Sequence, residues 1–130
     1  MTMGVWLLLG ALCVAPIWAC WQLAAMVSWR VLLGYAAGIS TATFFVYRHD
    51  KKRAESSGWR TPESTLHLLE LLGGWPGAFV AQRRLRHKTA KRSFQVTFWI
   101  IVVLHQVVSF DFTQQWRYSK HVYQALAGML

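Results

Sequence analysis

Apolar residues in this chain are massed in long uninterrupted runs, not spaced at the repeat of an amphipathic helix or strand. The first run, residues 4–26, carries no charged residue and would be about 34 Å long as a helix. That length spans a bilayer's hydrocarbon core of about 30 Å. Two further uncharged runs, residues 31–47 and 94–110, are shorter but still long enough to span. The pattern predicts three transmembrane helices.

Small residues recur at helical spacing in the first two runs. Gly34 and Gly38 lie one turn apart in the second run, and alanines 11, 15 and 19 repeat that spacing in the first. Such residues let helix backbones approach closely in lipid. We therefore expect residues 4–26 and 31–47 to pack as an antiparallel hairpin within one chain.

The stretch 61–82 is apolar but interrupted, and a short basic segment flanks it on each side, residues 48–60 and 83–92. Short loops rich in Lys and Arg stay in the cytoplasm. If 61–82 crossed the membrane, these two basic loops would face opposite compartments. We therefore predict a hairpin that either dips into the bilayer and returns or lies along its surface. Its structural residues would be Pro62, Gly73, Gly74, Trp75, Pro76 and Gly77.

The last segment, residues 112–130, alternates apolar and polar side chains at helical spacing. Trp116, Tyr123 and Leu126 share one face, with Lys120 and His121 opposite. Such a helix is expected to lie along the membrane interface. The predicted fold is a single all-α integral membrane domain over residues 1–130. It has three transmembrane helices around a broken re-entrant or interfacial hairpin, plus an amphipathic C-terminal helix.

Charge and cysteine content refine this picture. Fourteen Lys and Arg against five Asp and Glu give a net charge of +9, which suits the anionic inner leaflet of a membrane. Nucleic acid is not expected as a partner, because the charge sits in short loops between apolar runs. Cys13 and Cys20 are about 10 Å apart along one helix, too far for a disulfide, and are expected to be apolar fillers. We expect a multi-pass protein of the bacterial inner membrane, with the N-terminus and both basic loops cytoplasmic and the C-terminus outside.

Three ionisable residues share one face of the predicted hairpin, Glu63, His67 and Glu70. Ionisable groups at membrane depth suggest function. They could bind a divalent metal, relay protons, or hold the hairpin to the following basic segment through arginines 83, 84 or 86. The simpler interpretation, which we favour, is a face turned to headgroups and water or paired structurally with arginine.

The second basic segment could grip a phosphate, because arginine offers a bidentate fork and neighbouring histidine and lysine add donors. Its simpler interpretation is topogenic charge on the inner leaflet. His105, Gln106 and Ser109 in the third span are expected to hydrogen-bond between helices. His49 and Asp50 are expected to be solvated. The candidate headgroup-binding residues are Arg83, Arg84, Arg86, His87, Lys88, Lys91 and Arg92.

Several short blocks resemble the family of small bacterial membrane proteins catalogued as domain of unknown function 1294. They are Asp50-Lys51, Trp59-Arg60-x-Pro62-Glu63-x-x-Leu66-His67, Gly73-Gly74-Trp75-Pro76-Gly77 and His87-Lys88-Thr89-x-Lys91-x-x-Phe94. The resemblance covers roughly the second half of the chain. Many relatives carry an N-terminal cold-shock domain, which implies a cytoplasmic N-terminus; this sequence lacks that domain. The family has no established activity, so the resemblance implies no mechanism.

No nucleophile-elbow, P-loop, dinucleotide-binding or HExxH motif is present, and we expect neither a cofactor nor a metal. The favoured hypothesis is a non-enzymatic membrane protein whose basic cytoplasmic face engages anionic phospholipid headgroups or a protein partner. The alternative is a membrane-embedded enzyme or small transporter that uses the Glu/His stripe and the basic segment.

Overall fold

The computed structural model describes residues 2–56, 58–59 and 61–130, and over these residues every regular element is helical. This confirms the predicted all-α class. The elements in chain order are α1 (Met3–Leu23), α2 (Trp29–Glu55), α3 (Glu63–Leu69), the π-helical turn η1 (Glu70–Gly74), α4 (Trp75–Leu85), α5 (Arg92–Thr113) and α6 (Arg117–Gly128).

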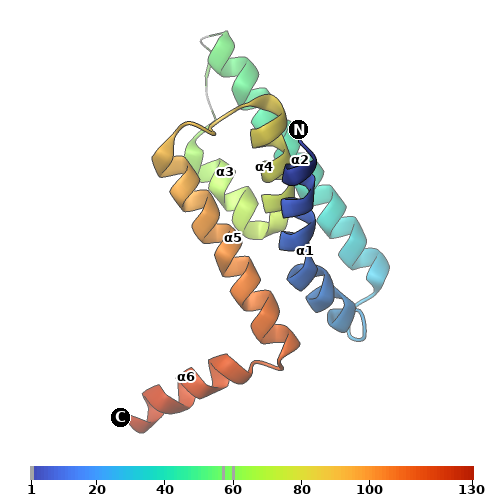
Figure 1. The fold of residues 1–130 in the computed structure, drawn as a ribbon, viewed down its shortest axis with the longest axis vertical. Coiled ribbons are helices and arrows are strands. Elements are labelled where there is room, and N and C mark those ends of the chain that lie inside the picture. The colour runs from blue at the N-terminus through green and yellow to red at the C-terminus, as the bar shows by residue number, and fades with distance from the viewer. Residues whose placement is uncertain (1, 57, 60) are drawn as a thin grey trace.

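Three of these helices, α1, α2 and α5, are long and apolar enough to cross a membrane. The segment α3–η1–α4 forms a helical hairpin between them. Figure 1 shows that α3 starts, and α4 ends, toward the same end of the molecule. The N-terminus lies at this same end, with the links from α2 to α3 and from α4 to α5. We call it the basic end, because residues 48–56 and 83–92 are found there. The α1–α2 turn and the α5–α6 junction lie at the opposite end (Figure 1).

The two basic segments are more helical than the sequence predicted. Helix α2 continues past Tyr47 to Glu55, and α4 continues to Leu85, so residues 48–55 and 83–85 are not loop. The run from 48 to 55 contains no Gly or Pro and is rich in good helix formers, so nothing in it stops α2. The charge pattern indicated where the apolar surface ends, and not where the helix ends.

The hairpin turns at Gly73, as the glycine-proline block predicted. Gly73 has a φ of 107°, a conformation that favours glycine because it has no Cβ. Pro76 falls in the first turn of α4, where its missing N–H leaves no hydrogen bond unmade. The sequence therefore allows α3 and α4 to run in opposite directions within about twenty residues.

Two glycines of the hairpin bring its backbone against α2. A Cβ added at Gly77 would overlap the backbone carbonyl oxygen of Ser40, and one added at Gly74 would overlap the hydroxyl of Thr43. A Cβ added at Gly34 or Gly38 would meet no atom within 4 Å in the part of the chain that the structure describes. The predicted packing role of Gly34 and Gly38 is therefore wrong. The close helix contact on α2 is made by the hairpin and not by α1.

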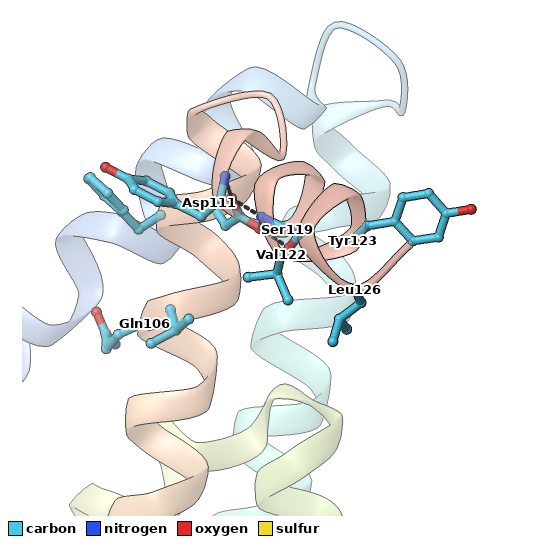
Figure 2. A pocket seen from close by; sticks show the side chains of 9 residues that line it. Gln106, Asp111, Ser119, Val122, Tyr123 and Leu126 are labelled. Carbon is cyan, nitrogen blue, oxygen red and sulfur yellow. Dashed lines mark hydrogen bonds between the residues drawn. The ribbon is translucent and has the colours of Figure 1, made fainter. Parts of the chain in front are cut away.

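Helix α6 is shorter than the predicted C-terminal helix and is fastened to α5 by Asp111. Helix α5 runs to Thr113, and α6 starts only at Arg117. The backbone N–H of Tyr118 donates to Asp111 Oδ1 at 2.9 Å, and the Ser119 hydroxyl donates to Asp111 Oδ2. A carboxylate from α5 thus satisfies backbone donors of the first turn of α6. A groove of about 780 Å³ lies between the two helices, with Val122, Tyr123 and Leu126 of α6 along one side (Figure 2).

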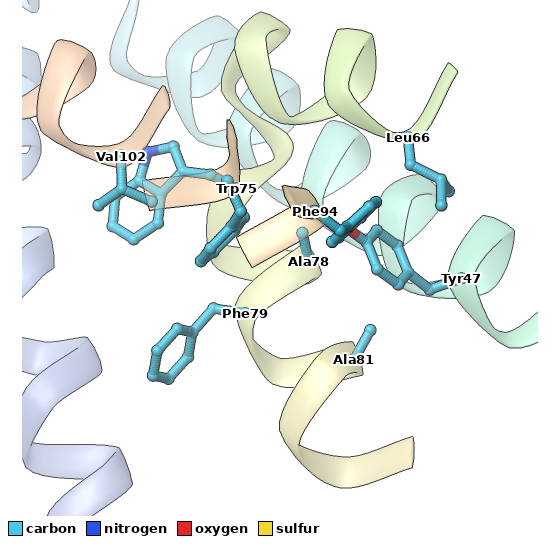
Figure 3. Packing of buried hydrophobic residues seen from close by; sticks show 9 residues of the cluster. Tyr47, Leu66, Trp75, Ala78, Phe79, Ala81, Phe94 and Val102 are labelled. Carbon is cyan, nitrogen blue, oxygen red and sulfur yellow. The ribbon is translucent and has the colours of Figure 1, made fainter. Parts of the chain in front are cut away.

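The hydrophobic core lies within the hairpin and the two helices that hold it. Figure 3 shows most of its members, which come from α2, α3, α4 and α5. Helix α1 contributes no buried residue and touches the core through partly buried side chains. The outer faces of the long helices expose many large apolar side chains. The core consists of Tyr47, Leu66, Trp75, Ala78, Phe79, Ala81, Phe94, Phe98 and Val102.

The glycine contacts give a matched pair of variants. Gly77→Ala should lower the free energy of unfolding by about 1–3 kcal/mol or more, because the new methyl group meets backbone of α2 that cannot move aside. Gly38→Ala should leave it unchanged or slightly raised, because the methyl group meets open space. Unfolding of the full chain in mixed detergent micelles measures both. Equal effects of the two variants would contradict this packing.

Candidate functional site: a buried polar cluster around the hairpin

Glu70, the first residue of the π-helical turn, is fully buried and is bonded to two other side chains. The Tyr47 hydroxyl of α2 donates to Glu70 Oε1. His67 Nδ1, one turn earlier on α3, lies 2.7 Å from Glu70 Oε2. The π-helical turn directs the carboxylate inward, toward α2 and the core. Burial raises the pKa of the Glu70 carboxyl, while the hydrogen bonds from Tyr47 and His67 oppose that rise.

Two glutamines extend this cluster from α4 to α5. Gln82 Nε2 donates to the Tyr47 hydroxyl at 3.2 Å, and Gln95 Nε2 donates to Gln82 Oε1 at 2.8 Å. The side chain of Gln82 is almost completely buried. A chain of hydrogen bonds therefore runs from His67 through Glu70, Tyr47 and Gln82 to Gln95, joining α3, η1, α2, α4 and α5. Buried polar groups are stable only when bonded in this way.

A second buried carboxylate lies nearer the basic end. Asp50 of α2 is fully buried, and its Oδ2 lies 2.6 Å from His87 Nε2. The backbone N–H of Thr61 donates to Asp50 Oδ1 at 3.0 Å. On the same helix, Lys51 donates to the backbone carbonyl of Leu85. The expectation that Asp50 is solvated is therefore wrong. This carboxylate ties the chain entering the hairpin and the chain leaving it to the end of α2.

Glu63, at the start of α3, pairs with two lysines of the α4–α5 link. Its Oε1 lies 3.1 Å from Lys88 Nζ and 2.5 Å from Lys91 Nζ. Hydrogen bonds from Lys91 and then Lys88 lower the pKa of this carboxyl. Because its side chain is about one-third exposed (34 %), water screens the pair. The pair joins the start of the hairpin to the segment that follows its end.

The predicted stripe of Glu63, His67 and Glu70 is thus divided into two parts. His67 and Glu70 belong to the buried cluster, whereas Glu63 lies at the surface with lysines. The solvated interpretation is wrong for Glu70. The proposed link between hairpin and basic segment does exist, but Glu63 makes it with lysines 88 and 91 rather than with Arg83, Arg84 or Arg86.

The stripe lies apart from the cavity at the hairpin turn. A cavity of about 670 Å³ lies among α1, α2 and α5 at the hairpin turn, and its wall includes Gly73, Trp75 and His105. Glu63, His67 and Glu70 are not among its lining residues. Over residues 2–56, 58–59 and 61–130, no group of three or more His, Cys, Asp or Glu side chains has the geometry of a metal site. The arrangement can share a proton between His67 and Glu70, but what it does most directly is hold helices together.

Of the polar side chains on α5, Gln106 makes the predicted hydrogen bond to another helix, whereas His105 bonds within α5. Gln106 Nε2 donates to the backbone carbonyl of Leu12 on α1 at 2.7 Å, which is the interhelical bond expected of it. His105 Nδ1 instead lies 2.8 Å from the carbonyl of Ile101 on its own helix. His105 and Ser109 both line the cavity at the hairpin turn.

Sequence reasoning missed Tyr47, Gln82 and Gln95 as members of the cluster. Tyr47 ends the second apolar run and Gln82 ends the predicted hairpin, so neither stands out in the sequence as part of a buried cluster. The available signal was that each is a hydrogen-bonding side chain at the boundary of an apolar segment. That signal does not say which partner such a residue meets.

The fold and this cluster define a class: an all-helical protein with three helices apolar enough to cross a membrane and a helical hairpin fixed between them by buried carboxylates. Residues 40–94 match the model of the family described as "Protein of unknown function (DUF1294)", which confirms the resemblance for this segment. The matched segment runs from Ser40, which contacts Gly77, to Phe94 in the core.

One curated relative is similar over most of its own length. The chain is 27% identical over 78 residues to the uncharacterized protein YsdA of Bacillus subtilis (strain 168), an alignment that covers 60% of this chain and 88% of that protein. No solved structure matches the chain. These comparisons show a similarity to this family over residues 40–94 and leave the activity open.

The Tyr47–Glu70 bond can be tested with a double-mutant cycle. Tyr47→Phe and Glu70→Leu should each destabilise the protein by about 1–3 kcal/mol, because each leaves a buried partner unsatisfied. The double variant should lose at least about 1 kcal/mol less than the sum. Tyr35→Phe is the matched control, since Tyr35 also bonds from α2 to the hairpin, at the Leu72 carbonyl, but is exposed. Strict additivity in the cycle would show that the two side chains do not interact.

Proposed function

We propose that this is a non-enzymatic protein of the bacterial inner membrane whose basic end lies at the cytoplasmic surface and engages anionic phospholipid headgroups. In this proposal α1, α2 and α5 span the bilayer, and the α3–η1–α4 hairpin enters it from the cytoplasmic side and returns.

The distribution of cations supports this assignment. Ten of the fourteen Lys and Arg residues lie in segments 48–56 and 83–92, which share the basic end (Figure 1). Concentration of positive charge at one end of a set of apolar helices is the pattern that keeps this end in the cytoplasm, next to anionic lipid.

The pairing of the acids is the single observation that carries the proposal. Glu70 and Asp50 bond inward, and Glu63 takes up Lys88 and Lys91. Within the described residues, no ion pair involves the exposed side chains of Lys52, Arg84 and Arg86. These three cations face outward with their charge uncompensated, and each can contribute about 1 kcal/mol to contact with an anionic surface.

The internal contacts of three basic residues support a smaller set of candidates for headgroup contact. His87 is buried against Asp50, and Lys88 and Lys91 are paired with Glu63. We therefore assign headgroup contact to the exposed cations and a fastening role to these three. The Glu/His stripe takes no part in ligand binding in this proposal, because it does not line the cavity at the hairpin turn and has partners of its own.

Lipid selectivity of the full chain in mixed bilayers tests the proposal. Spin-labelled phosphatidylglycerol should be restricted at the protein surface more than spin-labelled phosphatidylcholine, and high salt should weaken this preference. The triple variant Lys52→Gln/Arg84→Gln/Arg86→Gln should reduce it by at least about fivefold, which is the effect of losing a single cation that contributes about 1 kcal/mol.

The matched control removes three exposed cations elsewhere: Arg30→Gln/Arg117→Gln/Lys120→Gln has the same change in net charge, in residues outside the basic end. It should keep the preference for phosphatidylglycerol at the cytoplasmic leaflet. If wild type shows no preference, or if both triple variants lose it equally, the assignment of the basic end to headgroups is wrong.

A further inference from the structure

A groove follows one face of α5 away from the basic end. It has a volume of about 510 Å³. Arg92, the first residue of α5, lies at its basic end, followed by Gln95. The remaining lining residues are apolar, and the last of them, Val103, lies about 16 Å from Arg92 along the helix axis. This length is roughly the depth of one leaflet of the hydrocarbon core. The groove is lined by Arg92, Gln95, Val96, Trp99, Ile100 and Val103.

Arg83 of α4 is linked through Phe79 to Trp99, which lines this groove. Arg83 Nε is buried and has no hydrogen-bond partner among the residues that the structure describes. Its guanidinium lies 5.3 Å over the Phe79 ring, which in turn contacts Trp99 edge-on at 6.2 Å between ring centroids. Helices α4 and α5 are joined at the same level by the Gln82–Gln95 hydrogen bond. A buried donor without an acceptor is unfavourable, so this position suits a ligand that brings one.

We propose that the α5 groove binds one anionic glycerophospholipid of the cytoplasmic leaflet. Arg83 and Arg92 contact its phosphate, and one acyl chain lies along Val96, Ile100 and Val103. Arginine suits this role because its planar fork donates two parallel hydrogen bonds to phosphate oxygens. The proposal rests on the proposed function, which places the basic end at headgroup depth, and adds a defined site to it.

Charge complementarity favours a lipid over a second copy of the chain on this face. Each copy carries a net charge of +9, and pairing two copies along α5 would bring Arg92 and its basic neighbours toward each other. An anionic lipid supplies hydrocarbon for the apolar part of the groove and negative charge for its basic head.

Native mass spectrometry of the full chain in detergent, titrated with phosphatidylglycerol or phosphatidylcholine, tests the site. Wild type should retain one phosphatidylglycerol in preference to phosphatidylcholine. Arg92→Gln should bind it at least about tenfold more weakly, as expected for the loss of a charge-assisted contact. Arg83→Lys, which keeps the charge but not the fork, should also bind more weakly. Arg117→Gln is the matched control and should bind as wild type does, because Arg117 is exposed, lies outside the basic end and does not line the groove.

Three results would overturn the site. The first is equal weakening by Arg117→Gln and Arg92→Gln, which would mean that net charge and not the groove holds the lipid. The second is displacement of the bound lipid by soluble glycerol phosphate, which would mean that the acyl chain does not hold it. The third is a dimer in place of the lipid adduct. If the site fails in any of these ways while the spin-label preference persists, the proposed function stands; loss of that preference in wild type overturns the proposed function itself.

Discussion

The burial of the Glu70 carboxylate is the constraint on which the rest of the structure depends. A buried carboxylate without donors is strongly unfavourable, so Glu70 must meet both Tyr47 on α2 and His67 on α3. These bonds fix the hairpin at one height against α2. The glycines of the turn then allow the contact, because Gly74 and Gly77 leave room for Thr43 and Ser40. Hydrogen bonds of Glu70 thus position the hairpin against α2, and the lack of a side chain at Gly74 and Gly77 allows the two backbones to pack closely.

The same arrangement separates the cations of the basic end into two groups. Lysines 88 and 91 turn toward Glu63 and close the hairpin, and His87 does so through Asp50. The exposed arginines have no such partner among the described residues and lie where long apolar helices end. The ion pairs within the protein therefore determine which basic side chains remain available to bind an external anion. In this way the hairpin determines the surface that we propose to meet the lipid.

The helices and the break in the hairpin were predictable because their signals are local. Uninterrupted apolar runs and the positions of glycine and proline depend only on neighbours in the chain. The contacts of Tyr47 with Glu70 and of Asp50 with His87 were not predictable, because the partners lie 23 and 37 residues apart and pairing depends on how helices meet. The packing role predicted for Gly34 and Gly38 was wrong for the same reason. Their spacing permits another helix to approach closely, but it does not show which helix does so.

Cysteine labelling in intact cells and inverted membrane vesicles tests the central claim that the hairpin enters and leaves on one side. Single cysteines replace Ser56, Ala78 or Ala90 in a chain whose Cys13 and Cys20 are serine, and a membrane-impermeant maleimide is applied. Ser56 and Ala90 are exposed, and Ala78 is fully buried. We expect positions 56 and 90 to react only from the cytoplasmic side, and position 78 to be protected from both sides. Reaction of 56 and 90 from opposite sides would contradict it.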